Sequence, residues 1–292
     1  RDIGVTGVQT CALPICIRVD ERQFAGVHRV LAEVGRVLDV DRLPEVYVVN
    51  DPTTNAMTIG LDKPIVVLNS AVFDLLDEDE LRFVIAHELG HAVSGHAVYR
   101  TLLLWLMNMT GVWNSIPGGA LGIRVIIAGL FEWSRKAELS ADRAGLLATQ
   151  DPAVAFRVHM KLASGSGDLR DFDQTSFFAQ GQEYLESADL RDSVLKLVLN
   201  ERASHPYAVV RAAELRRWVD SGDYTAILGG TYPRREDDAT ATMSAAARQA
   251  ADSYSEAFKS SQDALGKLVH DVAGFFGSAK LWFDEQLRRT RD

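Results

Sequence analysis

Residues 77–93 read DEDELRFVIAHELGHAV, and this stretch decides how the rest of the chain is interpreted. Apolar side chains recur at helical spacing from Leu81 onward, and Asp77 followed by Glu80 three residues later is typical of a helix N-terminus. We therefore expect one helix with a buried face. Gly90 lowers the helix propensity of this segment, but it would let another backbone or a substrate approach closely.

The predicted helix carries two histidines, His87 and His91, with Glu88 between them. Residues i and i+4 share a helix face, so both imidazoles can direct a nitrogen at one metal ion while Glu88 points beside it. Zinc in such a site lowers the pKa of a water molecule and polarises a substrate carbonyl, and the glutamate takes the proton during attack. The pattern predicts His87 and His91 as zinc ligands and Glu88 as the general base of an amide hydrolase.

A catalytic zinc ion needs a third protein ligand, and we assign this role to Glu138. Glu138 and Asp142 are again four residues apart and share one face of a second predicted helix. Asp142 could accept the outer N–H of a ligating histidine and so fix its tautomer. The alternative is an exposed acidic helix face, for which Arg135, Lys136 and Arg143 would serve as ion-pair partners.

These motifs resemble the M48 family of zinc metallopeptidases, the group that includes the HtpX-like and Ste24-like proteases. In that family the HExxH helix is followed by a glutamate ligand in an ExxxD pattern, which Glu138 and Asp142 match. Further segments that resemble family signatures are Asn55-Ala56, residues 64–70 and residues 75–81. The resemblance implies an α+β, mainly helical, gluzincin-like metallopeptidase domain with a small β-sheet beside the HExxH helix. It also implies one zinc ion per chain.

The same resemblance suggests further site residues. Ser204-His205-Pro206 is similar to the family's His-Pro segment, with Arg211 as the arginine that follows. It implies that His205 faces the active site and hydrogen-bonds the oxyanion of the tetrahedral intermediate, while Arg211 orients substrate or supports the site. The alternative for His205 is a simple helix cap. Asn55 is assigned a supporting or substrate-orienting role, and His96 is interpreted as a helix-end residue.

Periodicity and turn residues predict the remaining elements. We expect helices over residues 23–38, 151–164, 183–199 and 206–220, and strands over residues 45–49 and 64–70. Proteases commonly bind substrate as an added β-strand, so an exposed edge at residues 64–70 would align a peptide beside the zinc. The alternative is an ordinary strand inside a sheet.

Composition limits the classes of protein to consider. A chain of 292 residues with 47% hydrophobic content can bury one substantial core, so we expect one main domain with appendages. The net charge of −9 argues against a nucleic-acid partner. Both cysteines, Cys11 and Cys16, fall near the start of the chain, so a disulfide framework is not expected in the core.

The chain is divided as follows. Residues 1–16 resemble a translated sequencing adapter and are expected to be non-native. Residues 17–230 form the predicted metallopeptidase domain, with a hydrophobic helical hairpin at residues 101–133. Each apolar arm has about a dozen residues, short of the roughly twenty that a spanning helix needs, so the hairpin is expected to be buried or to dip into a membrane surface. Residues 231–292 are expected to form a linker and an amphipathic helical tail.

The leading hypothesis is a zinc-dependent endopeptidase acting on unfolded or membrane-associated polypeptides, with a place in protein quality control as the resemblance implies. The alternative is a chaperone-like or membrane-surface binding protein that keeps the metal for structure. Glu88 favours the peptidase, because a structural site needs no base and prefers closed coordination. Contact with a membrane surface is left open, as is the choice between a cytoplasmic and a membrane-associated location, and the sequence specifies no oligomeric state.

Overall fold

The computed structural model describes residues 16–60, 63–108, 119–186 and 208–232, and the structural statements below concern those residues. The chain divides into two compact units. The first consists of Arg1–Trp105 and Leu130–Thr231, and the second of Leu106–Gly129 and Tyr232–Asp292. The first unit is mainly helical with one small mixed sheet, as the α+β prediction requires.

The sheet contains β1 (Cys16–Arg18), β2 (Glu45–Val49), β3 (Ala56–Ile59) and β4 (Ile65–Asn69) in the order β1-β2-β4-β3. β2 and β4 are parallel, and the outer strands pair with them antiparallel. β4 therefore has a neighbour on each side, so residues 64–70 form an ordinary interior strand rather than an exposed edge. In the described sheet, the edge beside α4 (Glu78–Val93) belongs to β3.

The core of this unit lies where the sheet meets α2 (Ala25–Val37) and α4. Successive side chains of a strand point to opposite faces, so Val46 and Val48 share one face of β2. Both are buried against helical side chains. Val30 and Val34 share one face of α2 and are also fully buried. Each such aliphatic side chain contributes about 1.5–3 kcal/mol through removal from water.

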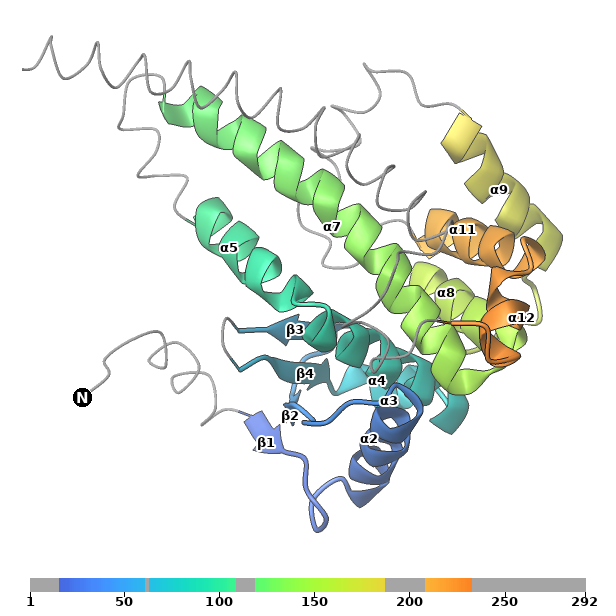
Figure 1. Ribbon diagram of the computed structural model, residues 1–292, viewed down its shortest axis with the longest axis horizontal. Helices are drawn as coiled ribbons and strands as arrows, with labels where there is room; N and C mark the ends of the chain where they lie inside the picture. Colours follow the sequence, from blue (N-terminus) through green and yellow to red (C-terminus); the bar gives the residue numbers. More distant parts are fainter. Residues whose placement is uncertain (1–15, 61–62, 109–118, 187–207, 233–292) are drawn as a thin grey trace, which may run out of the picture. The chain divides into compact units, whose positions relative to one another are not determined.

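The other helices follow in the chain: α3 (Ala71–Leu75), α5 (His96–Asn108), α7 (Gly119–Thr149), α8 (Pro152–Ser164), α9 (Gln174–Glu186), α11 (Ala208–Asp220) and α12 (Asp223–Leu228). α4 lies between the sheet and α8, and α11 packs on α8, α9 and α12 (Figure 1). Asp151 caps α8 by accepting from the Ala153 N–H at 2.8 Å, and Gly165 ends it in the left-handed conformation.

Most of the predicted elements within the described residues are confirmed, as α2, β2, β4, α4, α8 and α11 show. The start of the predicted helix 183–199 is wrong. α9 begins at Gln174, because Asp173 accepts hydrogen bonds from the backbone N–H and hydroxyl of Ser176 at 2.8 and 2.6 Å and so nucleates the helix earlier. Residues 187–199 and the predicted C-terminal helical tail lie outside the described residues.

Two further predictions concern the hydrophobic segments. Residues 101–133, predicted as a hairpin, contain the end of α5 and the start of α7, separated by residues 109–118, which lie outside the described part. Within the described ranges, we find no helix that is both long enough and apolar enough to span a membrane.

The expected boundary at residue 16 between a non-native segment and the metallopeptidase domain stays a prediction, although β1 begins at Cys16.

Candidate metal centre

The position of α4 is fixed at its first turn. Asp77 accepts a hydrogen bond from the Glu80 N–H at 2.9 Å, and Glu80 accepts one from the Asp77 N–H at 2.9 Å, so the predicted helix N-terminus is a capping box. The buried Glu80 carboxylate also binds Lys161 of α8 at 2.6 Å. α4 is buried on more than the one face that the sequence predicted, because residues 83–91 are buried without interruption. A helix held in this way keeps its side chains at defined positions.

Gly90 brings α7 against α4. A Cβ at Gly90 would lie 2.9 Å from the Cβ of Ala144 and 3.3 Å from the Cα of Ala141, both in α7. Any side chain larger than a hydrogen atom would therefore separate the two helices. The expectation that Gly90 permits a close backbone approach is confirmed. Because Glu138 lies about one turn before Ala141, the close approach places it beside the α4 histidines.

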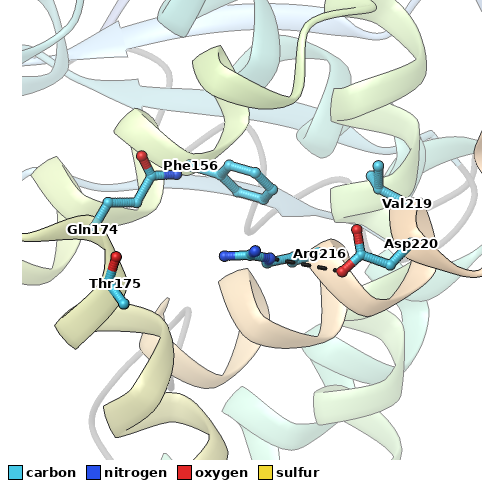
Figure 2. A pocket seen from close by; sticks show the side chains of 6 residues that line it. All are labelled: Phe156, Gln174, Thr175, Arg216, Val219 and Asp220. Carbon is cyan, nitrogen blue, oxygen red and sulfur yellow. Dashed lines mark ion pairs between the residues drawn. The ribbon is translucent and has the colours of Figure 1, made fainter.

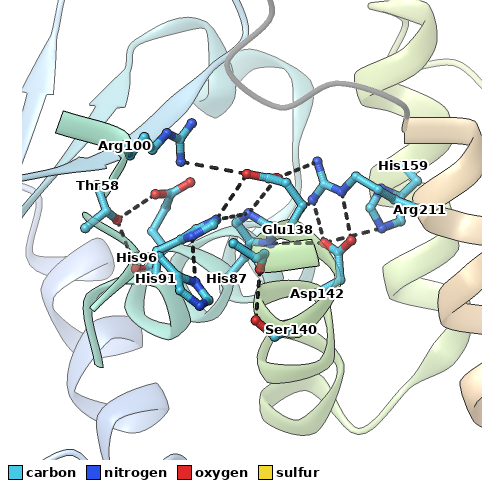
Figure 3. A network of polar contacts seen from close by, with 12 residues as sticks. Thr58, His87, His91, His96, Arg100, Glu138, Ser140, Asp142, His159 and Arg211 are labelled. Carbon is cyan, nitrogen blue, oxygen red and sulfur yellow. Dashed lines mark hydrogen bonds and ion pairs between the residues drawn. The ribbon is translucent and has the colours of Figure 1, made fainter. Parts of the chain in front are cut away.

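Three ligand atoms converge at this contact (Figure 3). The Nε2 atoms of His87 and His91 are 3.1 Å apart, and Glu138 places Oε2 at 3.4 Å from His87 Nε2 and Oε1 at 3.3 Å from His91 Nε2. Zinc bonds of about 2.0–2.1 Å in tetrahedral geometry put neighbouring ligand atoms about 3.3–3.4 Å apart. The donor set of two imidazoles and one carboxylate therefore fits zinc in chemistry and in spacing.

Burial decides between the two interpretations of the acidic pair. Glu138 is 1% exposed and Asp142 is 0% exposed, so the alternative of a solvated acidic helix face is wrong. Asp142 Oδ1 lies 3.0 Å from His87 Nδ1, on the side of the ring away from Glu138. This is the arrangement in which a carboxylate fixes the tautomer of a ligating histidine.

Arg211 of α11 joins both carboxylates. Its Nε donates to Asp142 Oδ2 at 2.8 Å, and its Nη1 lies 3.1 Å from Glu138 Oε2. The planar guanidinium has several N–H groups in a fixed fork, so one buried side chain can orient two acids. Of the two roles that the sequence left open for Arg211, support of the site is the one that these contacts favour.

The charged neighbours shift several pKa values. Burial alone would lower the pKa of His87, but hydrogen bonds to Asp142 and Glu138 outweigh it and raise that pKa to about 9. Burial lowers the pKa of His91 to about 4, despite the attraction of Glu138. Burial would raise the pKa of Asp142, yet Arg211 and nearby histidines hold it well below its usual range. Asp142 is therefore a carboxylate at neutral pH, and His91 offers a neutral imidazole.

Glu88 follows His87 in α4, its charge acts on His91, and it is itself buried. Its carboxylate Oε2 lies 2.6 Å from the hydroxyl of Thr58 in β3, and its main-chain oxygen lies 2.9 Å from the same hydroxyl. The general base that the sequence predicts is thus held between α4 and the edge strand.

Four residues near the centre were not assigned to the metal site from the sequence. Besides Thr58, these are His96, with Nδ1 at 3.2 Å from His91 Nδ1, Arg100, with Nη1 at 3.9 Å from Glu138 Oε1, and His159, with Nε2 at 3.7 Å from Asp142 Oδ1. His96 was interpreted as a helix-end residue, and it does begin α5. The short distance in sequence between His96 and His91 could have indicated that His96 lies at the metal site. The other three residues come from separate elements, and no sequence pattern linked them to the site.

Two predicted site residues have less structural support. His205 lies outside the described residues, so its assignment stays a prediction. Asn55 immediately precedes β3, and its carbonyl oxygen accepts a hydrogen bond from the Asn69 N–H at 3.0 Å. This bond anchors the start of the edge strand, while a role of Asn55 toward substrate stays a prediction.

A pocket of about 400 Å³ lies elsewhere, among α8, α9 and α11 (Figure 2). Its lining is formed by Phe156, Gln174, Thr175, Arg216, Val219 and Asp220. Arg216 Nε lies 3.6 Å from Asp220 Oδ2 within it. The pocket shares no lining residue with the His87, His91 and Glu138 cluster.

A buried HExxH helix that meets a glutamate from a second helix is a pattern typical of zinc-dependent hydrolases. Comparison with known protein families identifies one family: the model of peptidase family M48 matches residues 21–219 of the chain. The chain belongs to this family of metal-dependent peptidases, so the resemblance seen in the sequence is confirmed.

Curated relatives agree with the family. The chain is 33% identical to the plastoglobule-localized metallopeptidase 48 of Arabidopsis thaliana, over 73% of this chain and 62% of that protein. It is 35% identical to the mitochondrial metalloendopeptidase OMA1 of Arabidopsis thaliana over 45% of this chain and 28% of that protein. It is 28% identical to the HtpX protease homolog of Bacillus velezensis over 54% of this chain and 60% of that protein. The chain thus spans less than two thirds of each, and no solved structure matches it.

Proposed function

We propose that this protein is a zinc-dependent endopeptidase that uses His87, His91 and Glu138 as ligands and Glu88 as general base. The observation that supports it most is the geometry of the ligand groups: the two imidazole Nε2 atoms are 3.1 Å apart, and each lies 3.3–3.4 Å from one oxygen of the Glu138 carboxylate. Glu88, next to His87 in the chain, is buried as well. The family supports it as well, because its members are metallopeptidases. A structural zinc site would need no additional acid next to its ligands.

Zinc held by these residues would supply Lewis acidity, polarising the scissile carbonyl and making water more acidic. Glu88 takes the proton of the attacking water and passes it to the leaving amine. Asp142 holds the His87 ring through Nδ1, and Arg211 holds Asp142 and Glu138 in turn. This chain of contacts keeps the ligand atoms in place while the base works.

The edge of β3 is the surface on which we place the substrate. The Asn69 N–H donates to the Asn55 carbonyl, so residues 55 and 69 form a hydrogen-bonded pair. In an antiparallel ladder such pairs alternate, and the N–H and C=O of Thr58, opposite Val66, therefore point away from β4. The Gly60 N–H, two residues on, follows the same alternation and donates to Thr101 of α5 at 3.0 Å.

An extended peptide that pairs with this edge would be held through its main chain, beside Glu88. Main-chain pairing is nearly independent of side-chain identity, but it requires an extended, accessible segment. We therefore propose unfolded polypeptides as the substrate class, including those released at membranes, and a role in protein quality control.

Replacing Glu88 tests the proposed function. Glu88→Gln keeps the size of the side chain but cannot accept the proton, so we expect bound zinc to be retained and casein cleavage to fall by at least about 100-fold. The control is Glu78→Gln on the same helix, where Glu78 is exposed and pairs with Arg29 at 2.9 Å. Equal cleavage by Glu88→Gln and the native protein would remove Glu88 from the mechanism. A native protein without zinc or without cleavage would refute the peptidase.

A further inference from the structure

Thr58 is a buried polar residue that the reaction above does not use. It is 0% exposed, and its hydroxyl lies 2.6 Å from Glu88 Oε2 and 2.9 Å from the Glu88 main-chain oxygen. Thr58 belongs to the network of polar contacts drawn in Figure 3. A hydroxyl carries one proton, so it donates to one of these acceptors at a time, and a charged carboxylate forms the stronger bond.

The strand itself does not require this hydroxyl. A β-branched side chain suits a strand, and valine would fill the same space without a polar group. A buried hydroxyl has to be hydrogen-bonded to offset its loss of water, and here both partners belong to one residue, Glu88. The contact therefore serves the orientation of Glu88 more than the stability of β3.

We propose that Thr58 is a positioning residue: its hydroxyl holds the Glu88 carboxylate in the orientation in which it takes a proton from the attacking water. Fixing a glutamate side chain costs rotamer entropy, and a hydrogen-bond partner that is already in place reduces the part lost during the reaction. This inference rests on the proposed peptidase activity.

The second acceptor of the Thr58 hydroxyl, the main-chain oxygen of Glu88, becomes important later in the reaction. Once Glu88 has taken a proton, its carboxyl group can donate to the Thr58 hydroxyl oxygen, and the hydroxyl proton can turn to the Glu88 main-chain oxygen at 2.9 Å. Both protonation states of Glu88 are then hydrogen-bonded, and neither side chain has to move. The backbone N–H and C=O of Thr58 lie at the edge of β3. The same residue would therefore pair with the substrate peptide through its backbone and orient the general base through its side chain.

The test compares Thr58→Val, which removes the hydroxyl, with Thr58→Ser, which keeps it. For Thr58→Val we expect kcat for a peptide substrate to fall about 10- to 100-fold, with KM and bound zinc unchanged, and Thr58→Ser should restore most of kcat. The matched control is Thr149→Val in α7, whose hydroxyl bonds only its own helix in the contacts seen here, at 3.1 Å from the Gly145 oxygen. It should leave kcat at the native value.

A second measurement does not depend on activity. Crystal structures of the metal-free native protein and of Thr58→Val should show the Glu88 carboxylate at one position in the former and displaced or in several rotamers in the latter. An unmoved carboxylate, or a displaced one with native kcat, would overturn the proposal. If the native protein cleaved no peptide, the proposed function would fail, and the crystal structures alone would decide whether Thr58 positions Glu88.

Discussion

The close approach at Gly90 gives a quantitative prediction. In Gly90→Ala the new Cβ would lie 2.9 Å from the Ala144 Cβ, whereas carbon atoms prefer about 3.5–4.0 Å, so α7 must retreat by about 0.6–1.1 Å. Metal ligands tolerate displacements of about 0.2 Å. Alanine also improves helix propensity by about 1 kcal/mol, so the metal-free protein should lose little stability.

Zinc binding would then have to pull Glu138 of α7 back against the introduced contact. Overpacking of this kind costs about 1–3 kcal/mol, which corresponds to a zinc affinity about 5- to 150-fold weaker. Competition with a chromophoric chelator measures that affinity, and urea unfolding measures the stability of the metal-free protein. The control is Gly26→Ala in α2, where a Cβ meets nothing within 4 Å, and its zinc affinity should equal the native value. Native zinc affinity in Gly90→Ala would refute the reasoning.

Three further predictions concern buried polar residues. Asp142→Asn should weaken zinc binding about 10- to 100-fold in the same competition assay, because the neutral amide no longer polarises the ligating histidine. Glu80→Gln weakens the contact with Lys161, so the free energy of unfolding in urea should fall by about 1–3 kcal/mol with zinc affinity unchanged. Burial lowers the pKa of His159 to about 4, against about 6.5 when unfolded, so stability should fall as pH drops from about 6.5 toward 4. His159→Gln should flatten this dependence in urea unfolding midpoints measured across that range.

The part of the site that the sequence could predict is the part that one helix determines. His87, Glu88 and His91 are placed by the geometry of α4, and the cap at Asp77 fixed where that helix begins. Glu138 needed an additional argument, the requirement for a third ligand, because its distance from the histidines depends on how α7 packs. The sequence indicated that Gly90 would permit a close approach, but it did not show that α7 is the element that approaches.

The rest depended on tertiary arrangement that no local pattern encodes. β3 has only four residues and was not predicted as a strand, so neither the edge of the sheet beside α4 nor the partner of Glu88 could be located. The sheet order places β4 in the interior, although its sequence alone would also suit an edge. Arg100 and His159 reach the centre from separate helices, and their positions follow from packing rather than from spacing.

The most direct test is a crystal structure with anomalous diffraction measured at the zinc absorption edge. We expect one zinc peak per chain, about 2.0–2.2 Å from the Nε2 atoms of His87 and His91 and from a carboxylate oxygen of Glu138. A zinc-loaded protein whose peak lies away from these three side chains, or whose Glu138 carboxylate does not reach the metal, would contradict the account.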